Sequence, residues 1–169
     1  SLISDTEAEY ADMTDLNKRF NKSFDRLLKW IPSLPIPKIY AQIGALDQSV
    51  IIGNKTIGIC LDKYLGTNYP LYLKYYTYQQ RVSMTRAYIV PDCLVFYLLS
   101  VYPITQADKR SQLERDLHMA KIMWTVNKAV NQKLFKTKYV MMVDNYMRKH
   151  PDKDIEQVLL NDDYTTLLP

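Results

Sequence analysis

The sequence is poor in glycine, and this scarcity excludes the common nucleotide-binding loops. Only 4 of the 169 residues are glycine, and neither the GxGxxG nor the GxxxxGK[ST] pattern occurs. Both loops depend on glycines that let the backbone approach phosphate groups closely. We therefore expect no nucleotide-binding site of either type.

Cysteine and histidine are also scarce, which limits metal and nucleophile chemistry. The chain has two cysteines, Cys60 and Cys93, and two histidines, His118 and His150. A zinc site needs three or four ligands at suitable spacing, and neither HExxH nor CxxC is present. No GxSxG pattern marks a serine nucleophile. We expect no metal and no cofactor, two buried thiols, and histidines with structural or solvated roles.

Long apolar runs and clustered charge are absent as well. The longest apolar stretch, residues 88–102, is shorter than the roughly 20 residues of a membrane span. The net charge is +4, and lysine and arginine are interleaved with aspartate and glutamate. This pattern is typical of solvated helix faces, and we expect no nucleic-acid partner. No signal peptide is recognisable, and because the chain begins at Ser1, we expect that a leader has been removed.

The apolar stretch itself predicts a buried central helix. Pro91 suits the first helical turn, where its missing N–H has no partner to lose. Asp92 follows, where the helix dipole favours a carboxylate. Residues 93–99 have no polar face, and Pro103 ends the helix. A helix that is apolar on every side normally lies in the core.

The N-terminal segment predicts one long amphipathic helix over residues 4–31. Ser4 and Glu7 fit the S-x-x-E capping box at its start. Apolar residues recur at spacings of three and four on one side. They are Met13, Leu16, Phe20, Phe24, Leu27 and Ile31. The proline-rich residues 31–37 end the helix.

Three strands are predicted next, over residues 38–43, 49–52 and 56–61. Residues 53–55, Gly-Asn-Lys, supply turn chemistry for a hairpin between the last two strands. A short helix is predicted over residues 79–86. After the central helix, residues 107–135, 138–148 and 154–160 predict further helices and a loose C-terminus. The predicted fold is α+β, with a small antiparallel sheet of about three strands packed with several helices around a buried central helix.

Tyrosine is abundant, at 14 residues, and five tyrosines crowd residues 69–78. A tyrosine combines a flat apolar body with a polar tip, which suits a binding surface. The same residues serve equally well as half-buried packing residues. The segment thus predicts either a binding surface or part of the core.

Two carboxylates lie where apolar elements begin or end, Asp62 after the third strand and Asp92 at the start of the central helix. Two carboxylates that face one cleft can perform acid–base chemistry if the pKa of one of them is raised. Alternatively, Asp92 complements its own helix N-terminus and Asp62 caps a short helix at Lys63.

Two motifs carry a resemblance to a known family. The stretch IGICLDKYLGTNYPLYLKYY contains an L-D-x-[FY]-L-G motif, and YIVPDCLVFYLLS opens a helix with a Pro-Asp pair. Together with IPKIYAQIGAL they resemble the GldB gliding-motility lipoproteins of the Bacteroidetes, best over residues 36–102. The motif residues are Leu61, Asp62, Tyr64, Leu65, Gly66, Tyr69, Pro70, Tyr72, Pro91 and Asp92.

The resemblance implies a single GldB-like domain over residues 1–169 and an envelope lipoprotein whose lipoprotein signal is absent from this sequence. The family also resembles predicted zinc proteases, in which a small sheet precedes a helix that carries HExxH. In that alignment Pro91 and Val95 replace the two histidines, and Asp92 replaces the glutamate. The resemblance thus implies a degenerate zincin-like scaffold without metal ligands.

The expected function is a non-catalytic domain of a lipoprotein on the periplasmic side or the outer membrane. Its lipid anchor attaches it to the membrane, and it binds another envelope protein or a glycan. The candidate binding residues are Asp62, Tyr64, Tyr69, Tyr72 and Asp92. The alternative is a hydrolase that uses Asp62 and Asp92, which requires two accessible carboxylates within about 5–10 Å.

Overall fold

The computed structural model describes residues 1–169 and divides into two compact units. Unit 1 comprises Ser1–Asn21 and Pro35–Phe96, and unit 2 comprises Lys22–Leu34 and Tyr97–Pro169. Two of the three boundaries fall within helices, α2 (Thr14–Trp30) and α5 (Ile89–Val101), and the third lies between Leu34 and Pro35, after α2. The single domain over residues 1–169 stays a prediction.

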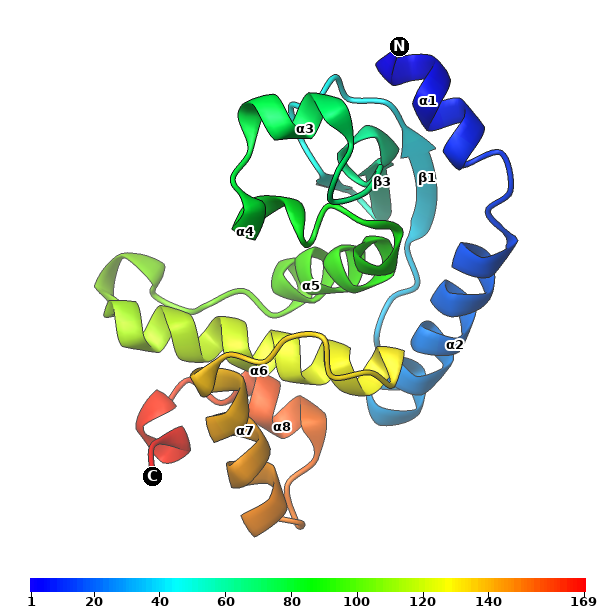
Figure 1. Cartoon of the computed structure of the whole chain (residues 1–169). Helices are drawn as coiled ribbons and strands as arrows, with labels where there is room; N and C mark the ends of the chain where they lie inside the picture. The colour runs from blue at the N-terminus through cyan, green and yellow to red at the C-terminus, as the bar shows by residue number, and fades with distance from the viewer. The chain divides into compact units, whose positions relative to one another are not determined.

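The sheet of unit 1 has three strands, β1 (Lys38–Gln42), β2 (Val50–Gly53) and β3 (Thr56–Cys60). Their order is β1-β3-β2, so β3 lies in the centre (Figure 1). The predicted hairpin between β2 and β3 is confirmed, because these strands pair antiparallel. The predicted antiparallel sheet is wrong, because β1 pairs with β3 in parallel and the sheet is mixed.

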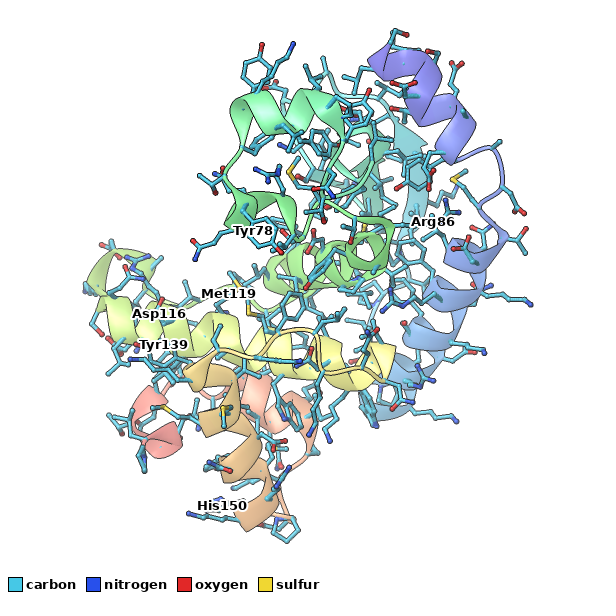
Figure 2. The ribbon with its side chains drawn as sticks, viewed as in Figure 1. Tyr78, Arg86, Asp116, Met119, Tyr139 and His150 are labelled. Carbon is cyan, nitrogen blue, oxygen red and sulfur yellow. The ribbon has the colours of Figure 1, made fainter.

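The first 30 residues form two helices, α1 (Leu2–Glu9) and α2, so the predicted single helix is wrong. Arg86 lies beside the connection between them (Figure 2) and donates hydrogen bonds to the carbonyl oxygens of Glu9 and Asp12, at 3.0 and 2.6 Å. These carbonyls would otherwise be acceptors within a continuous helix. Tyr10 turns inward at the break and is buried.

The first helix begins one turn earlier than predicted. Ser1 and Ser4 form its capping box, and Glu7 has no part in it. The predicted apolar stripe of α2 is confirmed except at its start. Met13 is 36% exposed, whereas the other five residues are buried.

Short helical segments follow the sheet in unit 1. They are η1 (Leu61–Lys63), α3 (Pro70–Tyr75), α4 (Tyr78–Arg81) and η2 (Arg86–Tyr88). The last two replace the single short helix predicted over residues 79–86. Helix α5 is buried along most of its length, as predicted, but Phe96 is 45% exposed. The helix is therefore not covered on every side.

Unit 2 contains η3 (Ala107–Lys109), α6 (Gln112–Val130), α7 (Lys138–Lys149), α8 (Ile155–Leu160) and η4 (Tyr164–Leu167). Helix α6 is shorter than the predicted 107–135, because Ser111 caps its start and Asn131, in the left-handed region, ends it. Figure 1 shows α7 and α8 gathered along α6. Helices α6, α7 and η4 form an apolar core that contains Leu117, Ala120, Trp124, Val140, Val143, Tyr164 and Leu167.

The predicted loose C-terminus is wrong, because Tyr164 and Leu167 are buried. The buried ammonium group of Lys121 donates hydrogen bonds to the carbonyl oxygens of Val158, Leu159 and Asn161, at 2.9, 3.3 and 2.6 Å. These carbonyls lie at the C-terminal end of α8, where that of Val158 also accepts the N–H of Asn161 at 3.3 Å. Burial lowers the pKa of Lys121 to about 8.

His118 has a structural role, as predicted. It is 4% exposed, and its Nε2 lies 2.8 Å from the carbonyl oxygen of Tyr102. Its Nδ1 lies 2.9 Å from the hydroxyl of Tyr164. With both ring nitrogens bonded inside unit 2, the side chain joins three segments of the chain. Cys60 and Cys93 are free, buried thiols, also as predicted.

Candidate functional site

Asp62 holds the loop between β1 and β2. Its two carboxylate oxygens accept the backbone N–H groups of Gly44 and Leu46, each at 2.7 Å, and the residue has no exposed surface. Ala45 and Leu46 have positive φ angles of 52° and 66°, a region that L-residues adopt at a cost. The buried carboxylate stabilises this strained backbone.

This geometry answers both predictions made for Asp62. It does not cap the helix at Lys63, because it lies within η1 and its oxygens bind a distant loop. It also does not meet the requirement for a catalytic pair, because it is not accessible to a substrate. Asp92 is bonded to a different partner, so the hydrolase alternative gains no support from these two residues.

Two tyrosines fix the backbone of the L-D-x-[FY]-L-G motif. The hydroxyl of Tyr72 donates to the carbonyl oxygen of Asp62 and accepts the N–H of Leu65 at 3.2 Å. The hydroxyl of Tyr10 donates to the carbonyl oxygen of Tyr64. Tyr10, Tyr64 and Tyr72 are all buried. In the structure, this motif is therefore a scaffold at the centre of unit 1.

Asp92 pairs with Tyr64. The tyrosine hydroxyl donates a hydrogen bond of 2.7 Å to Oδ2 of Asp92. Burial raises the pKa of Asp92 to about 6, although the bond from Tyr64 acts in the opposite direction. Burial and the neighbouring carboxylate also raise the pKa of Tyr64. The pair thus brings two predicted site residues together in the interior, where the tyrosine stays neutral.

Tyr69, the fifth predicted residue, lies closer to the surface. Its hydroxyl donates to Oδ2 of Asp5 at 2.6 Å, and this bond raises the pKa of Tyr69 to about 12. Its ring meets the ring of Tyr72 edge to face, with 5.0 Å between the centroids. Tyr69 therefore connects α1 to the buried tyrosines, and part of its surface remains accessible.

The exposed part of this region lies just after the predicted residues. Four large apolar side chains are exposed within residues 73–82, a stretch that we call the α3–α4 segment. They are Leu73 at 53%, Tyr75 at 69%, Tyr78 at 66% and Val82 at 40%. Figure 2 shows Tyr78 on α4. None of these four exposed residues is among the five site residues predicted from the sequence.

The α3–α4 segment is held in place by two cations. Arg81 donates to the carbonyl oxygens of Thr67 and Tyr76, at 3.0 and 2.9 Å. Lys63 donates to the hydroxyl of Tyr76 at 3.1 Å. Tyr72 and Tyr76, four residues apart, face inward, but their spacing does not separate them from the exposed Tyr75 and Tyr78, which are three residues apart.

No group of three or more histidine, cysteine, aspartate or glutamate side chains lies close enough to hold a metal ion. Pro91 and Val95, which would replace the zinc ligands in the resemblance to proteases, are buried on α5. The zincin-like scaffold itself is not shown and remains a prediction.

The family assignment follows from a comparison with protein families. The model described as "Gliding motility protein GldB" matches residues 1–139. The chain belongs to this family. The GldB match extends well beyond residues 36–102, where the motifs lie, and includes both N-terminal helices and α6. No curated protein and no solved structure matches the chain.

Membership of the GldB family implies an envelope lipoprotein. Among the helices, none combines the length and the apolar character needed to cross a bilayer.

Proposed function

We propose that the chain is a non-catalytic lipoprotein domain on the periplasmic side or the outer membrane, and that it works by binding another envelope protein. The α3–α4 segment is the docking surface in this proposal. The single observation that carries it is the exposure of Leu73, Tyr75, Tyr78 and Val82 within ten residues. Aromatic side chains are enriched at protein interfaces, where they bury much area at little entropic cost.

The buried residues beneath the segment support this proposal. Tyr72 bonds α3 to the backbone of Asp62 and Leu65, and Tyr64 bonds to Asp92. Arg81 of α4 bonds to the carbonyl oxygens of Thr67 and Tyr76. A surface built on fixed elements loses little entropy when it binds. In the proposal these predicted residues act as a scaffold, and Tyr69 with the exposed residues contacts the partner. A glycan partner, the other expectation from the sequence, remains an outcome of the test.

The test places a photo-crosslinking amino acid at Tyr75 or at Tyr78 of the lipoprotein in its native envelope. A matched control carries the same group at Tyr40, which is 45% exposed on β1 in the same unit. We expect a crosslinked protein from the two α3–α4 positions and none from Tyr40. Equal crosslinking at all three positions, none at all, or crosslinks to glycan alone would refute the proposed protein partner.

The captured protein is then purified and its affinity is measured. Replacement of both Tyr75 and Tyr78 by serine should weaken binding about tenfold or more, because tyrosine is enriched among the interface residues whose truncation costs most. Tyr40→Ser should leave the affinity unchanged. An unchanged affinity for the double variant would contradict the assignment of the docking surface.

A further inference from the structure

Unit 2 contains a cleft that the proposed function does not use. It lies between the end of α6, the loop of residues 131–136 and α7, and has a volume of about 560 Å³. This volume is within the range of small-ligand sites, roughly 300–1,000 Å³. The loop is held in shape by Asn127, whose side chain accepts the N–H groups of Leu134 and Phe135, both at 3.1 Å, and donates to the carbonyl oxygen of Phe135 at 2.9 Å.

The lining of the cleft is strongly basic. Four cations line it, namely Lys128, Lys133, Lys136 and Arg148, against a single acid, Asp144. Both oxygens of Asp144 are already occupied, by Nε1 of Trp124 at 3.0 Å and by the Arg148 guanidinium at 2.9 Å. Lys133 and Lys136 are exposed and form no ion pair. An anion that enters the cleft therefore meets uncompensated positive charge.

The sequence has a corresponding feature. Residues 117–143 contain five lysines and no aspartate or glutamate, so this stretch has a local excess of positive charge. Four of the five lysines are at the surface, and Lys128, Lys133 and Lys136 line the cleft. The fold thus places the positive charges of this stretch around the cleft.

The remaining lining indicates the class of anion. The amide side chains of Asn131, Gln132 and Asn145 line the cleft together with apolar surface from Phe135 and Met141. An amide both donates and accepts hydrogen bonds, which suits hydroxyl groups. We propose that this cleft binds an acidic oligosaccharide, with its carboxylates on Lys133 and Lys136 and its hydroxyls on the amides. The cleft shares no residue with the α3–α4 segment, and its proposed ligand does not depend on the docking surface proposed above.

Two other anionic partners compete with this assignment. A membrane surface is flat, whereas this site is a concave cleft. An acidic peptide would pair with the lysines, and its backbone groups would also pair with the amides. Both are therefore treated as outcomes that the experiment can distinguish.

The experiment measures binding of trigalacturonic acid to the intact protein by calorimetry at pH 7. Maltotriose, a neutral sugar of the same length, is the ligand control. The variant Lys133→Gln/Lys136→Gln removes two exposed charges from the cleft. The matched variant Lys149→Gln/Lys153→Gln removes two exposed charges from unit 2 outside the cleft, so both variants have the same net charge.

We expect saturable binding of trigalacturonic acid, no binding of maltotriose, and a loss of about tenfold in affinity only for the cleft variant. Equal losses in both variants would show general charge attraction and overturn the proposal. Absence of binding, or binding of maltotriose with equal affinity, would also overturn it. Tighter binding of a hexaglutamate peptide, or of vesicles with anionic headgroups, would assign the cleft to a different class of partner.

Discussion

At the scale of single residues, Asp92 is unusual because its burial disfavours the ionised form of its carboxyl group. The carboxylate is largely buried, and only the hydroxyl of Tyr64 donates to it. Burial therefore raises its pKa from the ordinary value of 3.8 to about 6. A buried carboxylate that must ionise at neutral pH destabilises the native state.

The pKa of Asp92 predicts a pH dependence of stability with a definite sign. Between pH 3.8 and about 6 the native state binds the proton that the unfolded state has already released. The free energy of unfolding therefore falls as the pH rises through this window, by up to roughly 3 kcal/mol. Asp92→Asn should abolish this fall, since its amide oxygen can still accept the bond from Tyr64.

Urea unfolding at several pH values between 3.5 and 7.5 measures this effect as a difference between wild type and Asp92→Asn. Tyr64→Phe is the informative control, because it removes the one hydrogen bond that lowers the pKa of Asp92. In that variant the fall should start at the same pH and extend to a higher pH. If the free energy of unfolding depends on pH in the same way in wild type and in Asp92→Asn, the pKa of Asp92 is not raised and the prediction is wrong.

At the scale of elements, the connection between β1 and β2 depends on Asp62. Two residues of this connection, Ala45 and Leu46, adopt left-handed conformations, and Asp62 binds the N–H groups on either side of Ala45. Hydrogen bonds to a charged acceptor are stronger than neutral ones. The loop geometry therefore depends on a residue sixteen or more positions away in the sequence.

Asp62→Asn should lower the free energy of unfolding by about 2–3 kcal/mol. The amide group of asparagine offers one acceptor oxygen, so one of the two buried N–H groups would face an NH₂ donor instead. The matched control is Asp47→Asn, an exposed acid in the same loop, which should change stability by less than about 0.5 kcal/mol. Equal effects of the two variants, measured by urea unfolding, would contradict the role assigned to Asp62.

The elements that the sequence predicts well are those with local signals. Gly53, Asn54 and Lys55 give the β2–β3 hairpin, and the caps Thr137 and Asp154 mark α7 and α8. The parallel pairing of β1 with β3 has no such signal, because partner choice depends on contacts between segments distant in the sequence. The break after α1 likewise depends on Arg86, which comes from more than seventy residues away.

The candidate site was likewise predictable only where the sequence carries a local signal. The sequence identified the region around Asp62, Tyr64 and Asp92, and the structure brings Tyr64 and Asp92 together. It could not show that Tyr72 turns inward while Tyr75 and Tyr78 face solvent, because all are tyrosines in one short run. Which of them is buried depends on the carbonyl and N–H groups of the 61–66 motif that Tyr72 meets.

At the scale of the whole molecule, neither compact unit is a continuous piece of chain. Unit 2 includes Lys22–Leu34 as well as the C-terminal part. Within this unit, Arg26 donates to the carbonyl oxygen of Ala129 at 2.7 Å, and the rings of Phe24 and Tyr97 lie 6.1 Å apart. The N-terminal part of unit 2 therefore contributes apolar and polar contacts to it.

This arrangement predicts that a fragment of residues 97–169 will not fold cooperatively by itself. It would lack Phe24, Leu27 and Ile31, which are buried in the native protein, and loss of one such side chain already costs about 2–5 kcal/mol. A chain of residues 22–34 joined to 97–169 by a flexible linker should regain a cooperative thermal transition. Circular dichroism and amide hydrogen exchange would compare the two fragments under the same conditions.

The linked fragment with Arg26→Ala and Phe24→Ala serves as the control, because it keeps the chain length and removes the contacts with Ala129 and Tyr97. We expect it to behave like the fragment of residues 97–169, since what the added residues supply is packing rather than length. A cooperative transition in the shorter fragment would mean that unit 2 obtains its core from the C-terminal helices alone. The half of α2 from Lys22 onward would then be an addition to a unit that folds without it.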